Sequence, residues 1–266
     1  MKNVLITGAN SYIGMSFAQY ACNKFNIESI NVRDDKWHEF DFSNFNTVLH
    51  CAGIAHTVPT EDIPYFAVNC DLAVSIAQKA KNAGVKQFVF LSSMSSVHDS
   101  KSLYGASKLA AEQKLQALVS NNFNLCILRP PMVYGLGCKG NFPRLVKLIT
   151  KLPFFANIKN QRSMIYIDNL SEFICQTISQ NKTGVHNPQN MEYVNTTELV
   201  KLIAGLHGRR MRTTRIFNPI IKLLQKKIEP LDKLFGNLTY TKSGDEAAYN
   251  VVNFEDSVQA AVKGTK

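Results

Sequence analysis

The sequence lacks closely paired cysteines, long apolar runs and an excess of acidic residues. Its six cysteines are scattered with no CxxC pair, and several fall in apolar stretches. This pattern favours buried free thiols in a reducing compartment over disulfides or a metal cluster. No apolar run is long enough to span a bilayer, and residues 1–6 run directly into a glycine turn rather than a secretory signal. We therefore expect a soluble cytoplasmic protein with no metal and no transmembrane segment.

Acidic residues are scarce: 20 Asp and Glu stand against 30 Lys and Arg, giving a formal net charge of +10. That balance favours anionic partners, such as nucleotide phosphates, nucleic acid or an acidic membrane face, without choosing among them. The most basic stretch, residues 208–238, is interpreted as a solvated helical face, with a membrane-surface or partner-enzyme contact as alternatives. No nucleic-acid-binding motif accompanies the charge, so we expect no nucleic-acid partner.

The first half of the chain alternates short β-branched runs with helical patterns, which is typical of βαβ units and a parallel sheet. The predicted strands cover residues 3–6, 29–32, 47–51, 87–91 and 124–128. The predicted helices between them cover residues 12–23, 71–82 and 104–119. After Tyr134 the rhythm changes. The later predicted elements are a helix over 142–152, a strand over 164–167, a helix over 169–179 and mostly short helices from Thr197 onward.

A glycine turn follows the first predicted strand. Gly8 permits the tight turn and Gly14 lets the following helix pack closely on the strand. The N-terminus of that helix directs backbone N–H groups at a pyrophosphate. A structural turn without a ligand is the alternative. The predicted dinucleotide contacts in this segment are Gly8, Asn10, Ser11, Tyr12, Ile13 and Gly14.

These elements predict an α/β fold: a Rossmann-type doubly wound parallel sheet with a small, mostly helical C-terminal part. A chain of 266 residues is long enough for one such domain and an appendage, and too short for two full domains. We expect the dinucleotide-binding core in residues 1–135, rejoined by residues 164–188. We expect the smaller, substrate-binding part in residues 136–163 and 189–266.

The end of the second predicted strand carries Arg33 and Asp34 side by side. Arg33 suits the 2′-phosphate of NADP, whereas Asp34 suits the free ribose of NAD. The sequence favours NADP over NAD on this ground, with simple solvation of both side chains as the alternative.

A serine pair, Ser92 and Ser93, closes the fourth predicted strand, and Tyr104 and Lys108 open the next helix. Spacing of four places Tyr104 and Lys108 on one helix face. A nearby ammonium lowers the pKa of a tyrosine, so Tyr104 could exchange a proton with a substrate oxygen, which a serine hydroxyl could also bind. Alone, a tyrosine and lysine at this spacing are commonplace; their place after the serine strand and the glycine turn makes them a candidate catalytic set.

The chain resembles the extended short-chain dehydrogenases/reductases of the NAD-dependent epimerase/dehydratase family. The order and spacing of the matching segments, more than any one of them, carry this resemblance. In chain order the segments are residues 7–14, 41–42, 49–53, 68–69, 88–93, 104–108, 128–135 and 166–169.

The resemblance implies roles for residues of the core. Tyr104 would be the acid/base, Lys108 would bind the nicotinamide ribose and tune Tyr104, and Ser93 would polarise the reacting oxygen, with Ser95 as a substitute. Asp41 and Phe42 would contact the adenine. The remaining cofactor residues implied are Cys51, Ala52, Gly53, Asn69 and Pro131.

The resemblance also implies a nucleotide-diphosphate sugar as substrate and a homodimer packed through the helices at 71–82 and 104–119. Asn141 and Arg162 stand where contacts to the diphosphate are expected, and the Arg162 fork suits phosphate oxygens. A surface ion pair is the alternative for Arg162.

Three departures from the family pattern bear on specificity. Ser11 replaces the usual middle glycine of the turn. Residues 33–46 are too few for the customary helix between the second and third strands. Ser93 and Tyr104 are unusually close in sequence, which indicates a trimmed loop over the sugar.

Residues 140–145 and 160–170 are most similar to bacterial sugar-nucleotide 4-ketoreductases and 4-epimerases of polysaccharide assembly. Our first hypothesis is reduction of a UDP-4-keto-6-deoxy-N-acetylhexosamine by NAD(P)H. The alternative is a UDP-hexose 4-epimerase with tightly bound NAD. A dehydratase is disfavoured because Met94 and Ser95 offer no acid/base pair. A third hypothesis, a non-catalytic dinucleotide sensor, is motivated by the shortened loops.

Overall fold

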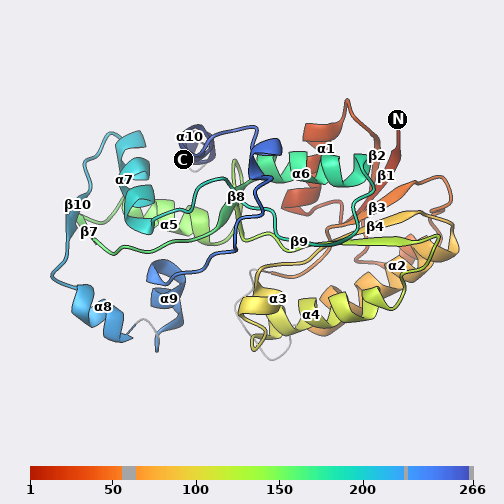
Figure 1. Ribbon diagram of the computed structural model, residues 1–266, viewed down its shortest axis with the longest axis horizontal. Helices are drawn as coiled ribbons and strands as arrows, with labels where there is room; N and C mark the ends of the chain where they lie inside the picture. The colour runs from red at the N-terminus through yellow and green to blue at the C-terminus, as the bar shows by residue number, and fades with distance from the viewer. Residues whose placement is uncertain (56–63, 225–226, 264–266) are drawn as a thin grey trace. The chain divides into compact units, whose positions relative to one another are not determined.

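The computed structural model describes residues 1–55, 64–224 and 227–263, which divide into two compact units (Figure 1). Unit 1 comprises Met1–Pro131 and Leu170–Pro188, and unit 2 comprises Met132–Asn169 and Gln189–Lys266. Within the described ranges, no helix is both long enough and apolar enough to cross a membrane. The division by contacts places residues 132–135 and 164–169 with the second unit. The assignment of cofactor to one part and substrate to the other stays a prediction.

Unit 1 contains one six-stranded, fully parallel sheet in the order β2-β1-β3-β4-β5-β9. Its strands are β1 (Asn3–Thr7), β2 (Asn26–Ile30), β3 (Thr47–His50), β4 (Gln87–Leu91), β5 (Asn124–Leu128) and β9 (Gly184–His186). Parallel strands buried on both faces read as continuous apolar runs, and β4 is buried at every position. The predicted Rossmann-type sheet is confirmed.

Helices cover both faces of this sheet (Figure 1). They are α1 (Tyr12–Ala21), α2 (Leu72–Asn82), α3 (Ser95–His98), α4 (Leu103–Gln116) and α6 (Ile167–Ser179), whose last ten residues belong to unit 1. On the α2–α4 face, Ile76 of α2 and Ala111 of α4 pack with Val48, Phe88 and Phe90 of the strands in one buried cluster. On the other face, Tyr20 and Lys24, at and just beyond the end of α1, bind Glu172 of α6.

Two of the sequence predictions for unit 1 need correction. β2 spans Asn26–Ile30 rather than 29–32, because it is an edge strand whose mostly exposed residues give no apolar run to read. β9 was not predicted: it has three residues, too few for periodicity to reveal. The short segment after β2 contains only a 3-10 turn, Asp35–His38, anchored by the buried Trp37, so the customary helix there is absent as its length indicated.

Unit 2 contains two small parallel strand pairs and a set of short helices. The pairs join β6 (Met132–Tyr134) to β8 (Met164–Tyr166) and β7 (Phe154–Ala156) to β10 (Arg212–Thr214). The helices are α5 (Asn141–Ile149), α7 (Thr196–Leu206), α8 (Asn218–Leu224), α9 (Glu229–Phe235) and α10 (Phe254–Lys263), with a 3-10 turn at Glu246–Ala248. The sequence predicted the helices here but missed β6, β7 and β10, each three residues long.

A buried ion pair ties α4 to the ends of two strands in unit 1. Glu112 of α4 is 4% exposed and accepts from Arg129 Nε at 3.0 and 3.1 Å through its two oxygens. Arg129 directly follows β5, and the Ser92 hydroxyl, directly after β4, donates to the same carboxylate. Removing one partner of a buried pair leaves an uncompensated buried charge.

We expect Glu112→Gln to lower the free energy of unfolding by about 3 kcal/mol, because the guanidinium of Arg129 loses its counter-charge. Denaturant titration of the purified protein measures this. Glu198→Gln is the matched control, since it breaks an exposed Glu198–Lys201 pair and should cost under about 1 kcal/mol. Equal losses in the two variants would contradict a structural role for the buried pair.

Candidate functional site

The glycine turn lies at the carboxyl end of β1 and is packed against the loop after β3. Gly8 has φ +105°, which favours glycine, and a Cβ there would lie 2.7 Å from the backbone nitrogen of Ala52. The N–H groups of Gly8 and Ala9 both donate to Ile30 O, at 3.0 Å, where β2 ends. The turn is therefore fixed between two neighbouring strand ends, the place where open parallel sheets bind ligands.

Ser11, which stands where the family has a glycine, caps α1. Its hydroxyl accepts from Gly14 N at 3.0 Å, and its backbone is extended, a conformation that does not require glycine. A Cβ on Gly14 would lie 2.6 Å from that hydroxyl and 3.1 Å from Ile6, so the close packing expected of Gly14 is present. The Ser11 side chain also hydrogen-bonds Cys51, which brings the turn and the β3 loop together.

The loop after β3 lies over Lys108. Gly53 is exposed, and a Cβ at this position would lie 2.9 Å from Asn69 Oδ1 and 3.3 Å from Lys108 Nζ. Asn69 is fully buried in a single π-helical turn, Ala67–Asp71, that leads into α2. Its amide accepts from Ile54 N at 2.8 Å and donates to Ile54 O and Ser107 Oγ, both at 3.1 Å. Asn69 therefore positions the loop on α4, and its predicted contact with the cofactor stays a prediction.

Ser93, Tyr104 and Lys108 come together at the carboxyl edge of the sheet. The side chain of Ser93 lies close enough to Tyr104 to lower the pKa of its phenol. Lys108 is 4% exposed, donates to Leu91 O at 2.9 Å and lies 4.7 Å from the centre of the Phe90 ring. Burial lowers the pKa of Lys108 to about 8, against smaller raising effects of Cys51 and Glu112.

The sequence argument that an ammonium lowers the pKa of Tyr104 needs correction for this structure. Burial raises the pKa of Tyr104, the hydrogen bond from Ser93 lowers it by less, and Tyr65 raises it further. Lys108 is not among the causes, because its ammonium is directed to Leu91 O and Phe90. Tyr104 is thus held as a neutral phenol at neutral pH, the state that donates a proton.

The short connection between Ser93 and Tyr104 leaves no room for a side chain at position 105, which is occupied by glycine. The chain between Ser93 and Tyr104 is folded into α3, which packs tightly on α4. A Cβ on Gly105 would lie 2.5 Å from Ser95 O and closer still to Asp99 O. Ser95, the suggested substitute for Ser93, lies on this α3 turn. Its backbone N–H donates to Ser93 Oγ at 3.1 Å. Sequence reasoning assigned no role to Gly105, although its place directly after Tyr104 was an available signal.

The remaining predicted cofactor residues lie apart from this cluster or are engaged elsewhere. Arg33 is exposed, and Asp34 caps the following 3-10 turn through Lys36 N at 3.3 Å. Asp41 is exposed and accepts from the backbone and hydroxyl of Ser43, which lowers its pKa. Phe42 is 1% exposed and packs in the core. Pro131 is buried at the end of unit 1.

The two predicted substrate residues belong to unit 2. Asn141 is exposed at the first position of α5. Arg162 is held by backbone carbonyls rather than by a carboxylate: its Nη1 donates to Gly236 O at 3.0 Å and Asp232 O at 3.4 Å. Burial lowers the pKa of Arg162, and Asp232 opposes this effect. The structure thus offers carbonyl contacts in place of the suggested surface ion pair.

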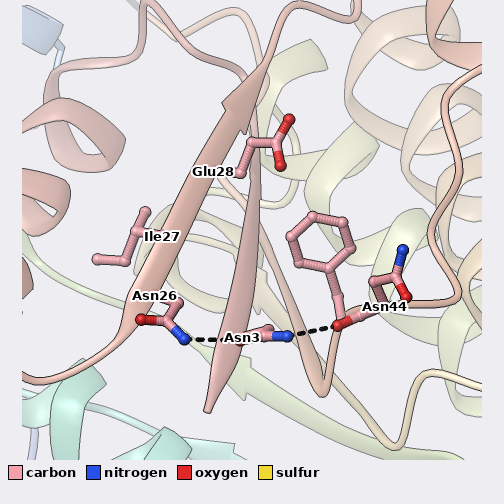
Figure 2. Close-up of a pocket in the computed structure, with 6 residues that line it drawn as sticks. Asn3, Asn26, Ile27, Glu28 and Asn44 are labelled. Atoms are coloured by element: carbon pink, nitrogen blue, oxygen red, sulfur yellow. Dashed lines mark hydrogen bonds between the residues drawn. The ribbon is translucent and has the colours of Figure 1, made fainter. Parts of the chain in front are cut away.

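A separate hollow of about 370 Å³ lies at the opposite, amino edge of the sheet (Figure 2). Asn3, at the start of β1, donates to Asn44 O at 2.8 Å and accepts from the amide of Asn26, at the start of β2, at 3.0 Å. These amides satisfy one another, and the hollow contains none of the predicted site residues.

Comparison with known proteins identifies the family. The profile of the NAD dependent epimerase/dehydratase family matches residues 4–192. The chain belongs to this family. It is 30% identical to the UDP-glucose 4-epimerase of Vibrio cholerae over 248 residues, 76% of this chain and 75% of that protein.

Further relatives agree with the assignment. The N-acetyl-α-D-glucosaminyl-diphospho-ditrans,octacis-undecaprenol 4-epimerase of Escherichia coli O157:H7 is 24% identical over 88% of this chain and 81% of its own length. The fold matches that of the UDP-glucuronic acid 4-epimerase of Bacillus cereus, solved with NAD, with a TM-score of 0.75, 17% identity and coverage of 99% and 98% of the two chains. The predicted enzyme class, an NAD(P)-dependent member of the short-chain dehydrogenase/reductase type, is confirmed.

This epimerase/dehydratase family member has a carboxyl edge that fits a nicotinamide dinucleotide. A Cβ on Gly8 would fill the space between the backbones of Gly8 and Ala52. The capped N-terminus of α1 begins beside that space. Because Gly53 has no side chain, nothing at that position covers the Lys108 ammonium. Glu112 and Arg129, which fix α4 to the strand ends, were not recognised from the sequence, because only their contact in space reveals them.

Replacing Gly105 by alanine should destabilise the protein and displace Tyr104, since the new methyl group meets the carbonyls of α3. We expect a loss of about 2 kcal/mol or more in the free energy of unfolding, typical of overpacking. Gly205→Ala in α7 is the control: open space surrounds that position, so the variant should gain up to about 1 kcal/mol. A Gly105→Ala variant as stable as the wild type would show that α3 and α4 can separate.

Buried Lys108 predicts a particular pH dependence of stability. Below pH 8 the folded state carries the full cost of a buried ammonium. As the pH rises from about 8 towards 10.5, the folded state loses the proton before the unfolded state does, so stability increases. Between pH 7 and 10, the free energy of unfolding of the wild type should rise by about 2 kcal/mol more than that of Lys108→Met.

Urea titrations of both proteins across that pH range measure the difference. The pH-independent part of the substitution, including the loss of the bond to Leu91 O, cancels in this comparison. Lys86→Met, at an exposed lysine, controls for the removal of one positive charge. A wild-type to Lys108→Met difference that does not change with pH would contradict a buried, depressed lysine.

Proposed function

We propose that this protein is a nucleotide-sugar 4-epimerase that retains NAD through its catalytic cycle. The observation that carries the proposal is that Ser93 and Tyr104 come together beside the buried Lys108, at the sheet edge that carries the dinucleotide turn. The two curated relatives described above are both 4-epimerases, which favours epimerisation over net reduction.

Epimerisation requires one group to remove a proton from a sugar hydroxyl and return it to the same oxygen. The dinucleotide, when bound, accepts a hydride from the adjoining carbon and gives it back. Tyr104 is the acid/base in this proposal: it would take the hydroxyl proton as the phenolate, which requires the bound ligand to lower its raised pKa, and would return that proton as the phenol. Ser93 steadies the developing charge on the oxygen.

Lys108 has two features that suit binding of the nicotinamide ribose. Its ammonium lies 3.3 Å from the position that a Cβ on Gly53 would take, so a ribose hydroxyl at that exposed backbone could reach it. It is also fixed by Leu91 O rather than free to follow Tyr104. We infer that Lys108 first binds and orients, and that any effect on the pKa of Tyr104 requires the ligand.

The substrate we propose is a UDP-hexose or UDP-N-acetylhexosamine. Arg162, oriented by the carbonyls of Gly236 and Asp232, presents a guanidinium suited to a diphosphate, and Asn141 supplies an exposed amide. The choice of NAD over NADP rests on retention of the cofactor and on the exposure of Arg33, whose guanidinium has no hydrogen bond or ion pair to the described residues that would orient it toward a phosphate. We retain from the family the proposal of a homodimer formed through α2 and α4.

The second candidate is the 4-ketoreductase, which uses the same serine, tyrosine and lysine with a cofactor that exchanges at each turnover. Reductases of this fold exist: the dTDP-4-dehydrorhamnose reductase of Bacillus anthracis, solved with NADP, superposes with a TM-score of 0.70 at 16% identity. The likeness concerns the fold alone, so reaction type must come from assay.

The deciding experiment measures dinucleotide released from the denatured purified protein, and conversion of UDP-glucose and UDP-N-acetylglucosamine without added cofactor. An epimerase contains NAD and interconverts a sugar pair. A reductase instead oxidises added NADH or NADPH with a UDP-4-keto-6-deoxy-N-acetylhexosamine. Bound dinucleotide without turnover of either kind would support the sensor hypothesis and overturn the proposed function.

Tyr104→Phe should reduce turnover at least a hundredfold while bound dinucleotide is nearly unchanged, because the ring is kept and only the proton-exchanging oxygen is lost. Turnover and released dinucleotide are measured on the same preparation. Tyr20→Phe, which removes a hydroxyl bound to Glu172 on α6, is the control and should turn over normally. Full activity in Tyr104→Phe would exclude the assigned mechanism.

A further inference from the structure

The surface formed by β10, α8 and the residues beside them carries charge of one sign. From Leu199 to Ile228 the sequence has eight basic residues and no acidic one. Arg210, Arg212, Arg215, Lys222 and Lys227 are exposed, and none forms an ion pair with a described carboxylate. Arg209 differs from them, since its guanidinium donates to Ile149 O and Leu152 O at the end of α5. The five unpaired side chains are therefore available to an external anion.

Large aliphatic side chains project from the same segment. Ile216 is 79% exposed, Ile220 57% and Leu223 70%. Ile220 and Leu223 are three residues apart on α8 and therefore lie on one face of that helix, and Ile216 lies in the turn that precedes it. Exposed apolar side chains in such a group, beside unpaired basic ones, are unusual for a surface that faces only water.

The fold of unit 2 holds this segment in place. β10 pairs with β7 through Arg212–Thr214, and Asn218 Nδ2 donates to Asn157 O at 2.8 Å (Figure 1). The ring of Phe217 stacks on Phe154, with centroids 5.8 Å apart and planes 14° apart. The exposure of Ile216, Ile220 and Leu223 is thus a feature of folded unit 2.

We propose that this surface binds the interface of an anionic phospholipid bilayer. The basic side chains would meet lipid phosphates, and Ile216, Ile220 and Leu223 would enter the boundary between headgroups and acyl chains. A second copy of the chain is a poor occupant, because it would bring a surface of the same charge. An acidic protein could satisfy the arginines and lysines, but it would not by itself account for the aliphatic side chains between them.

Beside this segment lies an open hollow of about 1170 Å³, lined by Lys201, Arg209, Arg210 and Arg212 together with residues of the α7–β10 turn. Arg210 and Arg212 belong both to the hollow and to the unpaired set. The hollow gives room for headgroups to approach these guanidinium groups from the side, in addition to the flat contact made by α8. The proposal does not depend on the reaction that the protein catalyses.

The test is sedimentation of the full chain with phosphatidylcholine vesicles, with and without phosphatidylglycerol, at low and high salt. We expect binding to the anionic vesicles at low salt, little to phosphatidylcholine alone, and loss at high salt. Arg212→Gln with Arg215→Gln should weaken binding to anionic vesicles at least about tenfold, because two positive charges that meet lipid phosphates are lost. Ile220→Ser with Leu223→Ser should weaken it to a similar degree, because apolar burial is lost.

Matched controls separate this surface from the overall charge and hydrophobicity of the protein. Lys86→Gln with Lys101→Gln removes two exposed lysines of unit 1, and Val251→Ser removes an exposed aliphatic side chain elsewhere in unit 2. Both controls should bind as the wild type does. Three outcomes overturn the proposal: no vesicle binding, equal binding to neutral vesicles, or equal loss in controls and site variants. Capture of an acidic protein without vesicle binding would instead assign the surface to a protein partner.

Discussion

The carboxylate of Glu112 holds together the sheet edge at which Ser93, Tyr104 and Lys108 meet. It receives Arg129 from the end of β5 and Ser92 from the end of β4, while its own backbone belongs to α4. Ser93 follows Ser92 directly, and Tyr104 and Lys108 lie on the same helix as Glu112, so the separation of Ser93 from Tyr104 depends on how this carboxylate docks α4. Because the group is buried, the geometry it imposes is strongly specified: any other docking leaves a charge without its partner.

The same carboxylate bears on Lys108, one helical turn before it. Burial pushes the pKa of this lysine down to about 8, and Glu112 and Cys51 only partly offset that effect. The ammonium is further compensated by Leu91 O and the face of Phe90. A buried lysine held this way lowers the stability of the isolated chain at neutral pH, which is consistent with a group placed for a ligand rather than for the fold. The exposed glycine next to it, Gly53, is where such a ligand would approach.

Sequence reasoning found what local pattern encodes. The parallel sheet followed from apolar runs and glycine turns, and Ser11, noted as a departure from the family, is explained by its capping preference. The three-residue strands and the exposed edge strand β2 leave too little periodicity to detect. The direction of the pKa shift of Tyr104 could not be derived from spacing, because it is decided by burial and by where Lys108 donates. Likewise, only packing reveals that the Phe42 ring and the Asn69 amide face inward.

The basic residues fall into two structural groups, which composition alone could not separate. Arg162 and Arg209 donate to backbone carbonyls, so their charge is fixed in direction and contributes to structure or to a defined site in unit 2. Arg212, Arg215 and Lys222 are exposed without a described acidic partner, next to aliphatic side chains that the fold leaves uncovered. Stability does not explain the second arrangement, because self-repulsion and exposed apolar area both oppose folding. Because both features lower the stability of the folded state, this surface is best explained by what it binds. Lipid phosphates match its basic side chains, and the apolar layer beneath them matches its aliphatic ones.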